Sequence, residues 1–88
     1  MSYLAKNYNR KKLSFVRGKG SFLYTKNGGK YLDFVQGIAV NSLGHAHPQL
    51  VKAINQQSKK LWHVSNAFVI PEGEELAKKL VEKTFADY

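Results

Sequence analysis

The chain has 88 residues, with 14 lysine and arginine residues against six acidic residues and a net charge of +8. It contains no cysteine, which excludes a disulfide framework or a thiolate metal site within it. It has neither the roughly 20 apolar residues of a membrane-spanning helix nor the apolar stretch of a secretory signal. We therefore do not expect a membrane-spanning or secreted protein.

The positive charge is concentrated in the first third of the chain. Eight basic residues and no acid precede Asp33, and from Asp33 onward six basic residues meet six acidic ones. Basic residues near Tyr3, Tyr8 and Phe15 are compatible with a small nucleic-acid-binding module that stacks bases and contacts phosphates. They also fit a solvated or subunit-packing arm whose balancing acids lie elsewhere in a longer polypeptide. We favour the second interpretation and expect no nucleic-acid partner.

The first 34 residues predict an arm followed by strands. Residues 1–14 have no clear period and predict an extended or irregular arm. Residues 15–34 are rich in aromatic and other β-forming residues and predict a hairpin. Its turn is expected at Asn27-Gly28-Gly29, because an Asn-Gly pair tolerates positive φ. Arg17-Gly18-Lys19-Gly20 is expected to form a loop or bulge before the first strand. Residues 35–47 are apolar, aperiodic and rich in small residues, which suggests a segment buried against something else.

Two prolines predict helix starts, because proline suits the first helical turn. The helix from Pro48 places Leu50, Val51, Ile54 and Leu61 on one face, with Lys59 and Lys60 in its last turn. After a loop over 62–70, a second helix begins at Pro71, with Glu72, Glu74 and Glu75 in its first turn. Glu74–Lys78 and Glu75–Lys79 are spaced for ion pairs along it.

Two motifs raise the question of a metal or phosphate site. His45 and His47 are a sparse metal-ligand set, since zinc needs three or four ligands, and we favour a shaped turn in which Gly44 allows an unusual backbone and the imidazoles bond nearby backbone groups. Arg17–Gly20 would cradle a phosphate only if it led into a helix, and it precedes a strand instead. We therefore expect no metal site, and a basic β-bulge rather than a phosphate loop.

One apolar run decides among these possibilities. Gly37-Ile38-Ala39-Val40-Asn41-Ser42-Leu43-Gly44-His45-Ala46-His47-Pro48 resembles the N-terminal signature of class III aminotransferases of the acetylornithine/ornithine type, which share a G-H-x-H-P turn. Gly18-x-Gly20, Gly28-Gly29-x-Tyr31-Leu32-Asp33-Phe34, Trp62–Asn66 and Glu74–Leu80 resemble further family segments in the same order. The resemblance covers the chain from about Tyr8 to Tyr88.

The resemblance implies that residues 1–88 are a partial N-terminal segment of a fold-type I aminotransferase. The segment would be α+β, with an irregular arm, a small β-hairpin or sheet and two helices. The family uses pyridoxal 5'-phosphate (PLP) and acts as homodimers. Its large PLP-binding domain, Schiff-base lysine, pyridinium-pairing aspartate and phosphate-binding turn would lie beyond these residues. We therefore assign no catalytic or cofactor-binding residue here and expect the segment alone to be inactive.

Two substrate-binding residues follow from the resemblance. Tyr8 matches a tyrosine that contacts substrate in ornithine aminotransferases, and its phenol can donate a hydrogen bond to a carboxylate. Ile38 matches a position that is tyrosine in ornithine δ-aminotransferases and apolar in acetylornithine and 4-aminobutyrate enzymes. An apolar side chain there favours N-acetylornithine, with 2-oxoglutarate as amino acceptor, in a cytoplasmic enzyme of arginine biosynthesis. Ornithine, 4-aminobutyrate and succinylornithine remain alternative donors.

Overall fold

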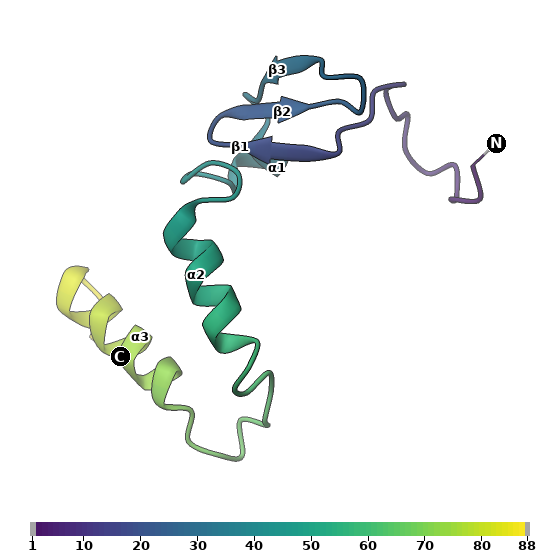
Figure 1. Ribbon diagram of the computed structural model, residues 1–88. Coiled ribbons are helices and arrows are strands. Elements are labelled where there is room, and N and C mark those ends of the chain that lie inside the picture. The colour runs from purple at the N-terminus through teal and green to yellow at the C-terminus, as the bar shows by residue number, and fades with distance from the viewer. Residues whose placement is uncertain (1, 88) are drawn as a thin grey trace. The chain divides into compact units, whose positions relative to one another are not determined.

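The computed structural model describes residues 2–87 (Figure 1). The chain divides into two compact units, Met1–Asn55 and Gln56–Tyr88. The first holds the arm, a small sheet, a short turn and most of one helix, and the second holds a loop and the last helix. The chain is thus an α+β segment with the predicted kinds of element, although several boundaries differ.

A three-stranded antiparallel sheet forms from consecutive strands: β1 (Arg17–Lys19), β2 (Phe22–Tyr24) and β3 (Lys30–Leu32), in the order β1-β2-β3. The expected turn between β2 and β3 is confirmed, with Thr25 N–H donating to Gly29 O at 2.9 Å and Gly28 at φ 83°. The expectation that Arg17–Gly20 is a loop or a basic β-bulge before the first strand was wrong for its first three residues, which pair in an uninterrupted register. They pair with β2, Gly18 opposite Leu23, because backbone pairing outweighs the low strand preference of glycine.

Aromatic rings of the sheet hold basic side chains. The Arg17 guanidinium lies 3.7 Å from the centre of the Tyr24 ring, and the Lys30 ammonium lies 4.1 Å from the Phe22 ring. Such cation–π contacts are attractive because the ring face is electronegative. Part of the basic excess in the first third is thus accommodated within the sheet itself.

Residues 35–47 contain one short element, α1 (Gln36–Ala39). All four of its residues have positive φ, so it is a left-handed turn rather than an ordinary helix. The absence of a helical or strand period in the sequence agrees with this irregular path. The apolar side chains of Ile38 and, directly after α1, Val40 are exposed, at 85% and 73%, so burial of this segment against further polypeptide stays a prediction.

The helix predicted from Pro48 is confirmed as α2 (Pro48–Gln57). It ends earlier than expected, so the prediction that Lys59 and Lys60 lie in its last turn was wrong. The Lys60 N–H bonds the carbonyl three residues back, at Gln57, at 3.0 Å, which is the tighter bonding common at helix ends. The Gln57 side chain then donates to the Leu61 carbonyl at 2.8 Å, and both interactions close the helix before residue 59.

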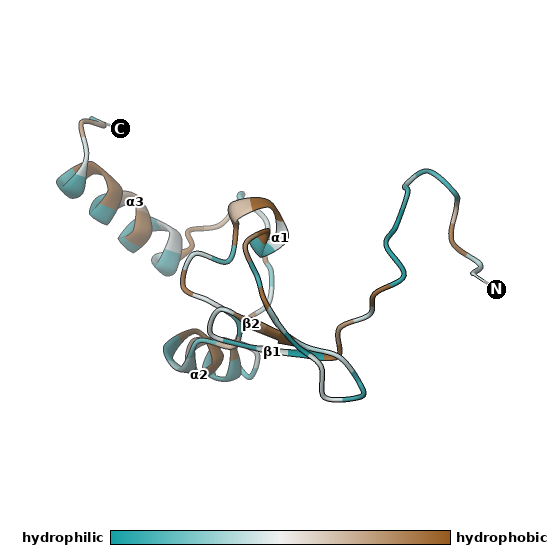
Figure 2. Ribbon diagram, turned by 90° about the horizontal axis from the view of Figure 1, so that it is seen from above, coloured by the Kyte–Doolittle hydropathy of each residue, from teal (hydrophilic) through white to brown (hydrophobic). Residues whose placement is uncertain are grey.

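The second predicted helix is α3 (Pro71–Lys83). The Glu75–Lys79 pair is confirmed at 2.8 Å, but Lys78 lies 3.8 Å from Glu82 instead of pairing with Glu74. Glu74 and Glu82 each lie four residues from Lys78, and at an exposed site the two possible ion pairs differ little in energy. Figure 2 shows apolar and polar residues on opposite sides of α3, an amphipathic helix with an unpartnered apolar face.

No residue in the described part of the chain is buried, and none forms a hydrophobic core. Large apolar side chains that sequence patterning placed on helix faces are exposed, including Leu50 at 47% and Leu76 at 59%. Within residues 2–87 no helix is long and apolar enough to cross a membrane. These apolar side chains are available for packing against further polypeptide.

Because hydrophobic burial is the main favourable term in folding, we predict that the isolated 88-residue chain does not unfold cooperatively as a monomer. Circular dichroism on heating should show a gradual loss of signal, or sedimentation should show self-association through the exposed apolar faces. The full-length protein, heated in parallel, should unfold in a sharp transition. A sharp, concentration-independent transition of monomeric 88-residue chain would contradict the prediction.

Candidate functional site

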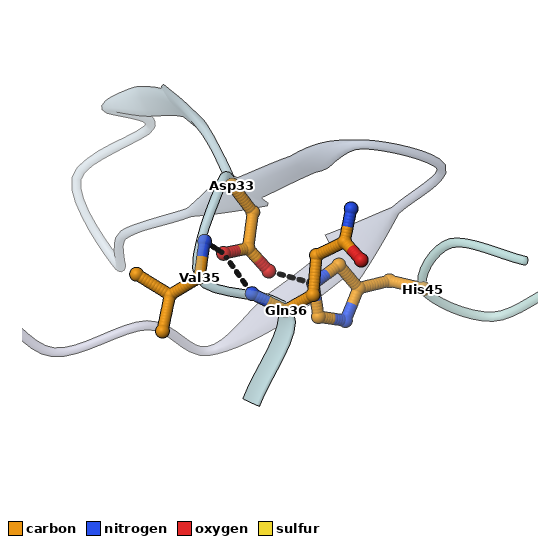
Figure 3. Close-up of polar contacts among 4 residues, drawn as sticks. All are labelled: Asp33, Val35, Gln36 and His45. Carbon is orange, nitrogen blue, oxygen red and sulfur yellow. Dashed lines mark hydrogen bonds and ion pairs between the residues drawn. The ribbon is translucent and has the colours of Figure 1, made fainter. Parts of the chain in front are cut away.

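Asp33 organises the polar contacts where the sheet ends. Its backbone N–H donates to the Ser21 carbonyl at 2.8 Å, which fixes it directly after β3. Its side-chain Oδ1 accepts the backbone N–H groups of Val35 at 3.1 Å and Gln36 at 2.9 Å. Figure 3 shows these two amides converging on one carboxylate oxygen at the entrance to α1.

The second oxygen of the same carboxylate meets an imidazole. Nε2 of His45 lies 2.6 Å from Oδ2 of Asp33 (Figure 3). We predicted that the histidines of the Gly44–Pro48 turn would bond backbone groups, which was wrong for the His45 ring. It holds for His47, whose Nδ1 accepts the Gln49 N–H at 3.2 Å.

The His45 backbone is tied to the sheet. His45 N–H donates to the Gly20 carbonyl at 2.8 Å, and Gly20 N–H donates to the His45 carbonyl at 3.0 Å. Gly44 has φ 82°, as expected for an unusual backbone, and a Cβ there would lie 2.9 Å from Gly20 O. A Cβ on Gly18 would lie 2.6 Å from Cγ of His45, so the ring packs directly on the Gly18 backbone.

These contacts set the ionisation of Asp33. The Gln36 N–H is the largest cause, followed by the hydrogen bond from His45, and together they hold the pKa of the Asp33 carboxyl below its usual value. The side chain is 7% exposed, so little water competes for its oxygens. An ionised carboxylate only accepts hydrogen bonds, so His45 Nε2–H is the donor of the pair.

The left-handed turn next to Asp33 is strained. Gln36, Ile38 and Ala39 have φ of 54°, 68° and 60°, and Gly37 between them has 61°. For residues with a Cβ, left-handed helical backbone costs roughly 1–2 kcal/mol each. Strain of this kind persists only where surrounding contacts hold it, and it gathers at functional sites.

The two predicted substrate-binding residues lie in different parts of this unit. Ile38 is the third residue of α1, and its side chain is 85% exposed. Tyr8 lies in the arm before β1, 72% exposed, with the Arg10 guanidinium 5.3 Å from its ring. In the described residues no hydrogen bond or ring contact joins Tyr8 to Ile38, and their roles stay predictions.

His45 and His47 were considered as metal ligands, and the Arg17–Gly20 run as a phosphate loop. Across residues 2–87 no group of three or more histidine, cysteine or acidic side chains is placed to hold a metal ion, and the His45 ring is committed to Asp33. The Arg17–Gly20 run does not form an open ring of N–H groups, because Gly20 N–H already donates to the His45 carbonyl. We assign neither a metal nor a phosphate to these residues.

Asp33 was not among the residues predicted from the sequence to form a site, although a signal for its turn was present. Aspartate often bonds the backbone N–H groups two and three residues later, which initiates turns. Asp33 lies near the end of the segment predicted as strands, just before an aperiodic segment, which is the setting for such a turn. Its bond to His45, twelve residues away, has no comparable signal in local sequence.

The lowered pKa of Asp33 gives a pH prediction for the full-length protein. Because folding lowers this pKa, the Asp33 contacts should stabilise the turn above the ordinary aspartate pKa and be lost as the pH falls through the folded-state pKa. The protection of the Gln36 amide against hydrogen exchange, scaled to the unfolded-chain rate at each pH, should fall on acidification. An Asp33→Asn variant does not titrate here, so an equal acid-induced loss in both proteins would contradict the assignment.

Comparison with known proteins relates this chain to one protein family. The family model described as "Aminotransferase class-III" matches residues 3–88. Acetylornithine aminotransferase of Agrobacterium fabrum is 58% identical over 80 residues, covering 91% of this chain and 20% of the relative. The chain thus spans about a fifth of the length of the curated relatives it matches.

Solved structures agree in fold. The crystal structure of acetylornithine aminotransferase from Elizabethkingia anophelis superposes with a TM-score of 0.91 at 32% identity, over 97% of this chain and 22% of that one. Plasmodium falciparum ornithine delta-aminotransferase gives a TM-score of 0.85 at 32% identity, over 91% of this chain and 21% of that one. Family match, sequence identity and fold all agree, and the chain belongs to the class III aminotransferase family.

Proposed function

We propose that residues 1–88 are part of a longer PLP-dependent aminotransferase that transfers the amino group of N-acetylornithine to 2-oxoglutarate. The observation that carries this proposal is the identity of 52–60% to curated relatives that bear the name acetylornithine aminotransferase. Among the matched solved structures, acetylornithine aminotransferases are 32–39% identical and ornithine aminotransferases 29–32%. The family membership supports PLP as the cofactor.

Ile38 supports the choice of donor. It lies exposed on the strained turn α1, where an apolar side chain offers no hydrogen bond to a free α-amino-acid head group. N-acetylornithine presents an acetylated amine instead. Tyr8 is proposed to donate a hydrogen bond from its phenol to a substrate carboxylate, and both residues act by binding rather than by chemistry.

The remainder of the enzyme would supply what these residues lack. PLP withdraws electrons from the donor carbon while the amino group is transferred, and the protein positions it. No residue of this segment is assigned to hold PLP, so the segment alone is proposed to be inactive. The whole protein is proposed to be a cytoplasmic homodimer in arginine biosynthesis, and partner polypeptide would cover the apolar faces that are exposed here.

The donor is tested on full-length protein loaded with PLP. Adding N-acetylornithine should bleach the visible absorption band of the bound cofactor, and 2-oxoglutarate should restore it. Ornithine, 4-aminobutyrate and succinylornithine, added at the same concentration, serve as matched donors. A band that only another amine bleaches would overturn the substrate, and a protein that binds no PLP would overturn the proposed function as a whole.

The role of Ile38 is tested by a pair of substitutions. Ile38→Tyr should raise kcat/KM for ornithine relative to N-acetylornithine by about tenfold, because one added hydrogen bond to a charged group contributes about 1.5–3 kcal/mol. Ile38→Phe is the control, since it adds the same ring without the hydroxyl. Equal ratios for the two variants would remove Ile38 from donor selection.

A further inference from the structure

The contacts around α1 all lead back to one carboxylate. We propose that Asp33 is a positioning residue, which holds α1 in its left-handed path and so sets the place of Ile38 against the amino donor. The part concerning Ile38 rests on the function proposed above, whereas the part concerning α1 does not. Asp33 itself touches neither substrate nor cofactor in this proposal.

The backbone changes hand at the entrance to α1. Val35 still has ordinary helical backbone, φ −81° and ψ −42°, whereas the next residue, Gln36, has φ 54°. The backbone therefore changes hand between the two amides that Asp33 Oδ1 accepts, at 3.1 and 2.9 Å. A single oxygen that binds both N–H groups fixes their relative orientation at the point where the change occurs.

Hydrogen bonds to two carbonyl groups close the turn of α1. The Val35 carbonyl accepts the N–H groups of Ile38 at 2.9 Å and Ala39 at 3.0 Å. The Gln36 carbonyl accepts those of Val40 at 3.0 Å and Asn41 at 3.2 Å. The two residues held by Asp33 are thus the two whose carbonyls close the turn, so Asp33 controls α1 through them.

Asp33 is itself anchored to the sheet. Oδ2 is held by His45, and His45 is bonded through its backbone to Gly20 and packed on the Gly18 backbone. The Asp33 N–H is bonded to Ser21, between β1 and β2. The carboxylate is therefore fixed to the sheet from two sides, and it transmits that fixed position to a turn whose own backbone is unfavourable.

The experiment compares two substitutions in full-length protein. Asp33→Ala removes both acceptor oxygens and should speed hydrogen exchange at the Ile38 and Ala39 amides by about tenfold, the effect of losing a charge-assisted hydrogen bond. Asp33→Asn keeps one acceptor oxygen for Val35 and Gln36 but carries no charge, so its exchange should lie between that of the wild type and that of Asp33→Ala. Glu82→Ala, which removes an acid from an exposed pair on α3, is the matched control and should leave these amides unchanged.

A rescue variant separates positioning from general destabilisation. Ala39→Gly relieves the positive φ at residue 39, because glycine has no Cβ to clash there. Added to Asp33→Ala, it should recover part of the lost protection, whereas it would not repair an unfolded protein. Unchanged exchange in Asp33→Ala, or no recovery in the double variant, would overturn the proposal.

The kinetic arm tests the link to Ile38. In Asp33→Ala, the ratio of kcat/KM for N-acetylornithine to that for ornithine should fall severalfold, and in Asp33→Asn it should fall less. An unchanged ratio in a protein with faster exchange would overturn the positioning of Ile38. If the wild type does not use N-acetylornithine, the proposed function fails, and the exchange series still decides whether Asp33 holds α1.

Discussion

The left-handed path of α1 depends on a single carboxylate, that of Asp33, which receives three hydrogen-bond donors from two directions. Two donors come from the backbone where the chain changes hand, and the third comes from His45, which is tied to the sheet. Charge-assisted bonds to a poorly hydrated oxygen are strong. They offset the strain of three non-glycine residues at positive φ in α1. The exposed side chain of Ile38 is thereby held in a defined position.

Much of the fold was predictable because its signals are local. Pro48 and Pro71 mark helix starts, and Asn27-Gly28 marks a turn, through backbone preferences that a few residues determine. The end of α2 was missed because bonds to the carbonyl three residues back replaced helical ones after Gln57. The left-handed path of the turn was not predictable, because Gln36, Ile38 and Ala39 individually disfavour positive φ. The Asp33 carboxylate that holds the turn is itself anchored by His45, twelve residues away. The roles of Tyr8 and Ile38 remain predictions, since they depend on substrate and on further polypeptide.

The absence of buried residues in the described part of the chain has a single physical explanation within this family. Amphipathic helices are stabilised mainly by packing their apolar face, and the apolar side chains of α2 and α3 are exposed. Relatives of the family are about five times as long as this chain, as their coverage of 20–22% shows. Further polypeptide of such length can cover these faces.

The most direct test of this account is a crystal structure of the full-length Asp33→Ala variant beside that of the wild type. The account predicts positive φ at Gln36, Ile38 and Ala39 in the wild type. In the variant it predicts a relaxed turn and a displaced Ile38, with the sheet and the Gly20–His45 backbone pairing intact. An unchanged left-handed turn in a well-ordered variant would show that α1 does not depend on Asp33 and would contradict the central claim.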